Sequence, residues 1–217
     1  MIRIKVCCIN SIQEAEMALE AGADYIGLVS EMPSGPGIIS EPEIEKIISS
    51  LSSSTMTVLL TSKVTAEEII KQYDYCKPFA LQLVDELGKN ESVRLRELLP
   101  DVELIQVIHV LNESSIQQAK KIEKYVDKIL LDSGNPNRNV KTLGGTGNTH
   151  NWEISKKLVE EVNVPVFLAG GLNYDNVIEA VKKVNPFGID LCSGVRTNGK
   201  LDRLKLNDFF NIVRNAD

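Results

Sequence analysis

Short apolar runs alternate with amphipathic segments along the whole chain. Eight runs rich in β-branched and other apolar residues predict strands over residues 3–9, 25–30, 55–61, 79–84, 102–109, 127–132, 165–169 and 189–193. Runs such as Val166-Phe167-Leu168-Ala169 are apolar throughout, which is typical of strands buried on both faces of a parallel sheet. A segment with helical periodicity follows each run, so the pattern predicts a repeated βα unit.

The predicted helices have recognisable N-terminal signals. Three Ser/Thr and Glu pairs have the spacing of a capping box, namely Ser11 with Glu14, Ser40 with Glu43 and Thr65 with Glu68. Asn173 is predicted to cap a helix over residues 175–184. These signals place helix starts shortly after the predicted strands, as a βα repeat requires.

Eight βα units favour a closed (β/α)8 barrel formed by one domain over residues 1–217. An open doubly wound sheet uses the same units and is the alternative fold. Such sheets usually have about five or six strands, however, and no Gly-x-Gly-x-x-Gly turn follows the first predicted strand. No linker rich in Pro, Gly or Ser divides the chain, and residues 52–54 are interpreted as a helix-to-strand connection.

Composition and charge exclude several classes of function. Hydrophobic residues make up 43% of the chain and charged residues 25%, as in ordinary globular proteins. The net charge of −6 argues against a nucleic-acid partner, for which a basic stripe is expected. No apolar run approaches the ~20 residues of a membrane span, and charges interrupt the N-terminal segment where a signal peptide is apolar. We therefore expect a cytoplasmic protein without a membrane partner.

The four cysteines form no CxxC pair and no metal-ligand spacing with histidine. We expect no metal site, and disulfides are unnecessary at this size and in this compartment. Cys76 and Cys192 are interpreted as structural. Cys7 and Cys8 are adjacent in the first predicted strand, so only one of them is expected to face a site. Any Cys/His dyad must use one of the two histidines, His109 or His150.

In a (β/α)8 barrel, chemistry is carried by the C-terminal ends of the strands and by the loops that follow. Gly170-Gly171 follows the seventh predicted strand and Ser193-Gly194 follows the eighth. Glycine lets a phosphate approach backbone N–H groups closely, and a following helix N-terminus adds partial positive charge. We expect both loops to bind a phosphate group; the alternative is that their glycines only form tight turns.

The loop after the sixth predicted strand, residues 133–150, has a length that is often functional. It contains Gly144-Gly145-Thr146-Gly147, and Gly145, Thr146 and Gly147 are candidates for contact with a substrate or for a lid. The alternative is an excursion of the chain without function.

Two titratable residues at strand ends are candidates for acid–base chemistry. Asp132 ends an apolar run, where desolvation raises the pKa of a carboxyl and suits it to general acid catalysis. The alternative is that Asp132 braces a loop or caps a helix. Cys7 ends the first predicted strand, where a thiolate acts as base or nucleophile if a cation or helix N-terminus stabilises it. Its alternative role is that of an inert buried thiol.

Together these positions resemble the phosphoribosylanthranilate isomerase family over nearly the whole chain. The resemblance rests on the order and spacing of Lys5-Val6-Cys7, Ala21-Gly22-Ala23-Asp24, Leu130-Leu131-Asp132, Gly144-Gly145-Thr146-Gly147, Trp152, Ala169-Gly170-Gly171-Leu172-Asn173, Asn176-Val177, Ser193-Gly194-Val195 and Gly199-Lys200-Leu201-Asp202. It implies a (β/α)8 barrel that is a monomer or a homodimer.

The activity that this resemblance implies is an Amadori rearrangement in tryptophan biosynthesis. N-(5-phosphoribosyl)anthranilate becomes 1-(2-carboxyphenylamino)-1-deoxyribulose 5-phosphate, with Asp132 as general acid, Cys7 as general base and the two C-terminal glycine loops on the phosphate. The substrate is thus a small phosphorylated sugar, and no metal or organic cofactor is implied.

The chain departs from the family pattern mainly around the aromatic end of that substrate. Cys8 replaces a glycine, Gln82-Leu83-Val84-Asp85 replaces Gln-Leu-His-Gly, and Arg196 replaces a glutamate. Residues 32–38 lack the arginine that binds the anthranilate carboxylate in the family. Either Arg196 or Arg138 supplies the cation, or the aglycone is not anthranilate.

Two further hypotheses follow from these departures. One is a paralogue that rearranges or binds a different phosphorylated sugar, and the other is a non-catalytic sensor of a phosphorylated ligand. The sequence assigns no role to Asp85 or His109.

Overall fold

Eight parallel strands close into a barrel in chain order in the computed structural model, which describes residues 1–134 and 149–216. The strands are β1 (Arg3–Val6), β2 (Tyr25–Val29), β3 (Met56–Thr61), β4 (Ala80–Leu83), β5 (Glu103–His109), β6 (Lys128–Asp132), β7 (Val166–Leu168) and β8 (Gly188–Leu191). β8 pairs with β1 and closes the ring. The predicted (β/α)8 fold class is therefore confirmed.

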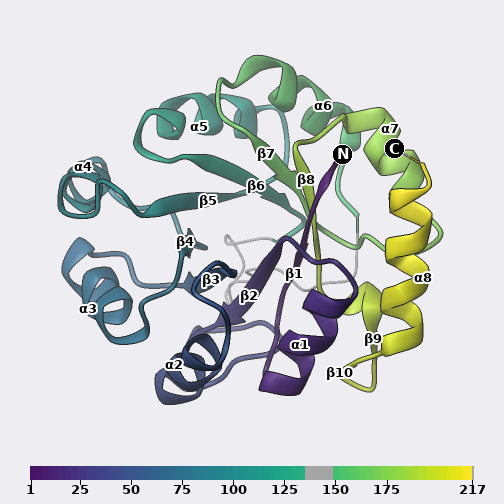
Figure 1. Ribbon diagram of the computed structural model, residues 1–217. Helices are drawn as coiled ribbons and strands as arrows, with labels where there is room; N and C mark the ends of the chain where they lie inside the picture. The colour runs from purple at the N-terminus through teal and green to yellow at the C-terminus, as the bar shows by residue number, and fades with distance from the viewer. Residues whose placement is uncertain (135–148, 217) are drawn as a thin grey trace.

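One helix follows each strand and packs on the outside of the barrel, as Figure 1 shows. The helices are α1 (Ile12–Glu20), α2 (Glu41–Ser50), α3 (Ala66–Cys76), α4 (Lys89–Leu98), α5 (Ser114–Ile122), α6 (Trp152–Glu161), α7 (Val177–Val184) and α8 (Arg203–Arg214). Smaller elements are the 3-10 turns η1 (Glu123–Tyr125) and η2 (Ser193–Val195) and the antiparallel pair β9 (Arg196–Thr197) and β10 (Lys200–Leu201).

The predicted capping pairs lie at the starts of α1, α2 and α3. At α2, the backbone N–H of Ser40 donates to Glu43 Oε2 at 2.9 Å, and Pro42 lies in the first turn, where its missing N–H is harmless. The predicted start of α7 is wrong. That helix begins at Val177 because Asn173 Oδ1 accepts the N–H of Asp175 at 2.9 Å, and this Asx turn competes with the first helical turn.

Inward and outward side chains alternate along the strands, so the barrel has two apolar layers. Outward residues such as Ile4 and Leu168 pack under the helices, whereas inward residues such as Leu130 and Phe167 fill the barrel. At the amino end the Phe167 ring packs edge-on against Tyr25 and Phe187, each at 5.4 Å between ring centroids. This end of the barrel is therefore closed by packing, and the inward residues of the opposite end are left to line a cavity.

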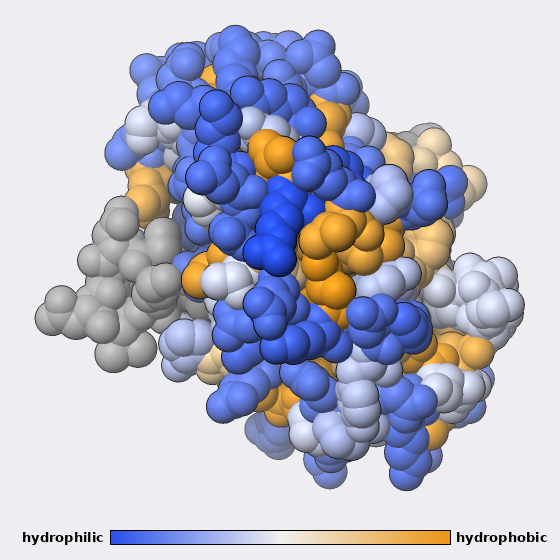
Figure 2. Space-filling model, turned by 90° about the vertical axis from the view of Figure 1, so that its left-hand side faces the viewer, coloured by the Kyte–Doolittle hydropathy of each residue, from blue (hydrophilic) through white to orange (hydrophobic). Residues whose placement is uncertain are grey.

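The helices are amphipathic and turn polar faces outward. The face shown in Figure 2, on the side of α3 and α4, is largely hydrophilic, with hydrophobic residues in small groups between polar ones. Among the described residues, no helix has the length and apolar character needed to cross a membrane.

Candidate active site

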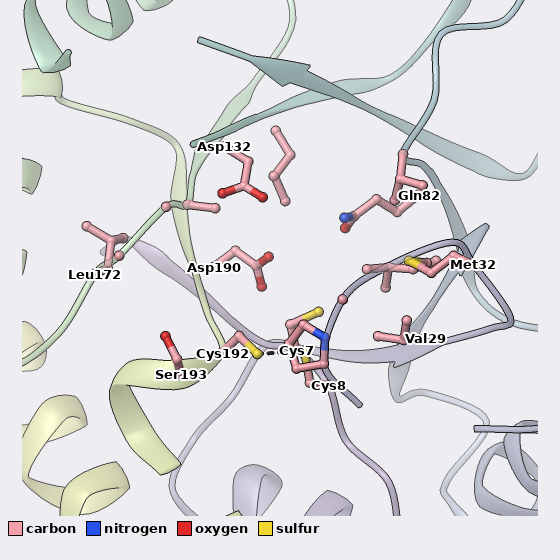
Figure 3. A pocket seen from close by; sticks show the side chains of 18 of the residues that line it. Cys7, Cys8, Val29, Met32, Gln82, Asp132, Leu172, Asp190, Cys192 and Ser193 are labelled. Carbon is pink, nitrogen blue, oxygen red and sulfur yellow. Dashed lines mark hydrogen bonds between the residues drawn. The ribbon is translucent and has the colours of Figure 1, made fainter. Parts of the chain in front are cut away.

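A cavity opens at the carboxyl end of the barrel (Figure 3). Five of the predicted site residues line it, namely Cys7, Asp132, Gly170, Gly171 and Ser193. Apolar side chains complete the wall, among them Val29, Met32, Leu60, Val84 and Leu130. The carboxyl ends of β1, β6, β7 and β8 therefore meet around one space, as the barrel geometry predicts.

Asp132 projects into this cavity from the end of β6 (Figure 3). Burial raises the pKa of its carboxyl to about 6, and the nearby Asp190 carboxylate adds to the rise. The Ser133 N–H opposes this by donating to Asp132 Oδ1 at 2.7 Å. A carboxyl with this pKa keeps a protonated fraction near neutral pH, which is the property that a general acid requires.

A buried ion pair joins the neighbouring strands β1 and β8, and its Asp190 lines the cavity. Lys5 of β1 is fully buried, and its Nζ lies 2.9 Å from Oδ1 of Asp190 on β8. Burial alone would lower the pKa of Lys5, but the attraction of Asp190 outweighs it and the pKa of Lys5 is raised. Gly27 on β2 makes room for this pair, because a Cβ there would lie 3.1 Å from Lys5 Nζ and 3.0 Å from Cys7 Sγ.

The Cys7 thiol has an environment that favours its thiolate. The largest contribution is a hydrogen bond from the Cys8 thiol, and the positive charge of Lys5 adds to it. Together they lower the pKa of Cys7 against the opposing effects of burial and of the Asp190 carboxylate. Cys7 and Asp132 thus face one cavity with pKa values shifted in opposite directions, which is the pattern of a base and an acid.

Cys8 also lines the cavity, so the prediction that only one of the adjacent cysteines faces the site is wrong. The alternation of a regular strand does not apply, because β1 ends at Val6 and Cys8 has a left-handed backbone with φ of 63°. Cys192, interpreted from the sequence as structural, lines the same wall, and its Sγ lies 2.6 Å from Cys8 Sγ (Figure 3).

The Arg196 guanidinium is engaged beneath the cavity wall instead of lining it. It contacts Glu14 of α1 through two nitrogens, each at 3.0 Å from a carboxylate oxygen. One of these nitrogens also donates to the backbone oxygens of Cys8 at 2.6 Å and Cys7 at 3.3 Å. Only 7% of the Arg196 side chain is exposed. Arg196 therefore ties the loop after β8 to the loop after β1.

The two C-terminal glycine loops lie next to each other. Gly170 and Gly171 have positive φ angles of 81° and 65°, which favour glycine. A Cβ at Gly194 would lie 2.2 Å from the Leu172 oxygen, so the loop after β8 packs directly on the loop after β7. Asn176 Nδ2 donates to the Gly171 oxygen at 3.0 Å and holds that peptide from the side of α7. Gly194 itself shapes the loop and does not line the cavity.

Several residues considered from the sequence lie outside the cavity or outside the described residues. Gly145, Thr146, Gly147 and Arg138 fall outside the described residues. Neither His109 nor His150 lines the cavity. Burial lowers the pKa of both rings, that of His150 to about 4, so both are neutral at pH 7. Within residues 1–134 and 149–216, no group of three His, Cys, Asp or Glu side chains is placed to hold a metal ion.

Sequence reasoning missed the pair of Lys5 and Asp190 and the partnership of Arg196 with Glu14. A signal for the first two is present, since each is a charged residue inside an apolar strand that the barrel buries. The pairing itself joins positions 185 residues apart, and spacing along the chain gives no sign of it.

Known proteins resemble the chain over its full length. Residues 4–212 match the family described as N-(5'phosphoribosyl)anthranilate (PRA) isomerase. The N-(5'-phosphoribosyl)anthranilate isomerase 2 of Methanosarcina mazei is 35% identical over 216 residues, covering 99% of this chain and 95% of the relative. The crystal structure of phosphoribosyl anthranilate isomerase from Thermotoga maritima superposes with a TM-score of 0.84 at 28% identity, covering 99% of this chain and all of that one.

A second crystal structure carries information on a ligand. It is a phosphoribosyl anthranilate isomerase in complex with reduced 1-(o-carboxyphenylamino)-1-deoxyribulose 5-phosphate. Its TM-score with the present chain is 0.81 at 25% identity, covering 99% of this chain and 100% of that one.

Proposed function

The chain belongs to the phosphoribosylanthranilate isomerase family and is an isomerase. From this membership we propose that it rearranges N-(5'-phosphoribosyl)anthranilate in tryptophan biosynthesis. The product is 1-(2-carboxyphenylamino)-1-deoxyribulose 5-phosphate. The observation that carries the proposal is the pairing of Cys7 and Asp132 in one cavity, with the pKa of the thiol lowered and that of the carboxyl raised to about 6.

Asp132 starts the proposed reaction as the general acid. Its proton passes to the furanose ring oxygen, the bond between that oxygen and C1′ breaks, and the anilino nitrogen supplies the electron pair that forms a protonated Schiff base. A positioned acid contributes roughly 10²–10⁴-fold to such a step. Because desolvation keeps part of the Asp132 population protonated near neutral pH, the carboxyl is able to donate at physiological pH.

Cys7 completes the proposed reaction as the general base. Its thiolate removes the C2′ proton, and the C–H electron pair moves toward the iminium carbon to give an enolamine. Tautomerisation of the enolamine to the ketone yields the product. The iminium of the substrate accepts the electron pair, so the protein's task is to hold the two proton-transfer groups on opposite sides of the bound sugar.

Two buried ion pairs support the position and charge of Cys7 in this proposal. Lys5 adds positive charge beneath the thiolate and is held by Asp190. Arg196 fixes the backbone oxygens of Cys7 and Cys8 and is itself held by Glu14. Arg196 therefore serves as a positioning residue, and groups other than Arg196 must bind the carboxylate of the substrate.

The phosphate is proposed to bind at the paired glycine loops. Gly170, Gly171 and Ser193 line one side of the cavity, and the packing of Gly194 on Leu172 holds the two loops together. Backbone N–H groups of such loops are the usual phosphate ligands after the last two strands of a (β/α)8 barrel. Gripping the phosphate orients the sugar between Cys7 and Asp132.

The direct test is turnover. The purified protein is incubated with N-(5'-phosphoribosyl)anthranilate while the loss of anthranilate fluorescence is followed, with an active isomerase of the same family as the positive control. We expect saturable turnover without added metal or cofactor. Absence of turnover above the uncatalysed rate, with the positive control active, would contradict the proposal.

One observation favours a second candidate, a paralogue for a different phosphorylated sugar. The described lining of the cavity holds no lysine or arginine, and the loop after β2 contributes Met32, Ser34, Gly35 and Pro36 to it. Thermal-shift measurements with ribose 5-phosphate and other phosphosugars, against the reduced anthranilate-bearing product analogue, separate the two candidates. Stabilisation by the anthranilate-bearing ligand alone would exclude the second.

A further inference from the structure

Cys8 and Cys192 place two free thiols in contact in the cavity wall. Cys192 Sγ lies 2.6 Å from Cys8 Sγ, and the contact is drawn in Figure 3. The two residues are 184 positions apart in the chain and come from the loops after β1 and β8. Neither thiol is itself assigned a proton transfer in the proposed reaction.

The backbone holds this thiol pair in place from both sides. β1 and β8 are in register up to Val6 opposite Leu191, and the Cys7 N–H donates to the Leu191 oxygen at 2.7 Å just beyond. Arg196, four residues after Cys192, donates to the Cys8 oxygen at 2.6 Å. The left-handed backbone of Cys8 turns its side chain back toward the end of β8. The contact is therefore part of the joint between the first and last βα units.

The two thiols differ in their access to a reagent. Cys8 is buried at 5% exposure, whereas Cys192 is partly exposed where it lines the cavity. Interactions with the Cys192 and Cys7 thiols, together with burial, raise the pKa of Cys8, which makes Cys8 a slow nucleophile. A reagent that enters the cavity thus meets Cys192 first, with Cys8 in contact as the resolving thiol.

We propose that Cys8 and Cys192 form a reversible dithiol–disulfide pair in the cavity wall, oxidised by low-molecular-weight disulfides of the glutathione class. The Cys192 thiolate attacks one sulfur of the small disulfide, a mixed disulfide forms and one small thiolate leaves. Cys8 then loses its proton to solvent and attacks Cys192 Sγ, which forms the Cys8–Cys192 bond and releases the second small thiolate. Two electrons pass from the protein to the small disulfide, which becomes two thiols.

Oxidation has a consequence for Cys7 that rests on the proposed function. In the reduced protein the neighbouring Cys8 thiol lowers the pKa of Cys7, and Cys8 has no thiol hydrogen to offer when it is held in a disulfide. Loss of a hydrogen bond to a charged group changes the acid dissociation constant of that group by about tenfold or more. The oxidised enzyme is therefore expected to have kcat/KM about tenfold lower at neutral pH, with full recovery after reduction.

The test follows the covalent bond itself and does not depend on turnover. The reduced full-length chain is treated with oxidised glutathione, remaining thiols are alkylated, and the protein is digested with trypsin without reduction. We expect the intact protein to lose two hydrogen atoms and residues 6–46 to be joined to residues 184–196. The bond should form in wild type, Cys7→Ser and Cys76→Ser, and should be absent in Cys192→Ser and in Cys8→Gly, where glycine suits the left-handed backbone.

Two results would overturn the thiol pair, namely a stable mixed disulfide with no internal bond, and a bond that survives in Cys8→Gly but is lost in Cys7→Ser. An internal bond that leaves kcat/KM unchanged would overturn the stated consequence for Cys7. If the reduced protein did not turn over N-(5'-phosphoribosyl)anthranilate, the proposed function would fail while the mass and peptide results would still decide whether the thiol pair forms.

Discussion

The two ends of the barrel are built from the same strands and differ in what their inward side chains do. At the amino end, Phe167 packs between Tyr25 and Phe187 and is fully buried. At the carboxyl end, Cys7 and Asp132 are buried but border a cavity, and their pKa values are shifted. One end uses burial to exclude water from apolar surface, whereas the other uses burial to change proton affinity. Substitutions at the two ends should therefore affect different quantities.

The largest effect on stability is expected at the amino end. Phe167→Ala removes a fully buried ring, so the free energy of unfolding should fall by about 3–5 kcal/mol. The control is Phe79→Ala, because Phe79 is 46% exposed and its loss should change stability by less than about 1 kcal/mol. Denaturant unfolding measures both. Equal effects of the two substitutions would show that the aromatic cluster does not hold the barrel closed.

Arg196→Ala should destabilise the chain nearly as much, because it leaves the Glu14 carboxylate buried without its partner. Removal of one member of a buried pair costs about 3 kcal/mol or more. Arg203→Ala is the matched control, since Arg203 forms an exposed ion pair with Glu20 of the same helix α1 and should lose at most about 1 kcal/mol. A rise in KM with unchanged stability would instead place Arg196 on the substrate.

Asp132→Asn should raise the free energy of unfolding at pH 8, whereas Phe167→Ala at the amino end should lower it. The pKa of Asp132 is raised from its ordinary value of 3.8 to about 6 in the folded protein, so ionisation above pH 6 opposes folding. Removing that charge should raise the free energy of unfolding by about 1–2 kcal/mol, after the cost of burying an amide N–H without a partner is subtracted.

The pH dependence tests this stabilisation. The advantage of Asp132→Asn should be complete above pH 6 and should shrink as the pH falls from about 6 toward 3.8, where the wild-type carboxyl becomes protonated in both states. Thermal unfolding of both proteins across this range measures it. An advantage that is constant with pH would show that Asp132 has no raised pKa.

The smallest expected effect on stability is that of Cys8→Gly. Glycine relieves the left-handed backbone but loses buried contacts, so the unfolding free energy should change by less than about 1 kcal/mol. Because the Cys8 thiol no longer lowers the pKa of Cys7, the acid limb of the kcat/KM profile should move to higher pH. An unmoved acid limb would show that Cys8 does not set the protonation of Cys7.

The strands and most helices could be predicted from the sequence because apolar runs and capping residues act locally. The same reasoning placed Cys7 and Asp132 at strand ends, where the barrel brings them to one cavity. It failed for Cys8, since strand alternation stops with β1 at Val6 and a left-handed residue follows. It also failed for Arg196, because its ion-pair partner Glu14 lies on helix α1, 182 residues away.

The most direct test of the account is the kcat of Cys7→Ser and Asp132→Asn with N-(5'-phosphoribosyl)anthranilate. Each group is proposed to move a proton in the reaction, so each substitution should lower kcat by about 10²-fold or more without loss of folding stability. Cys76→Ser, a buried cysteine of α3 that does not line the cavity, should keep kcat within a few-fold of wild type. Wild-type kcat in either cavity variant would contradict the assignment of base and acid.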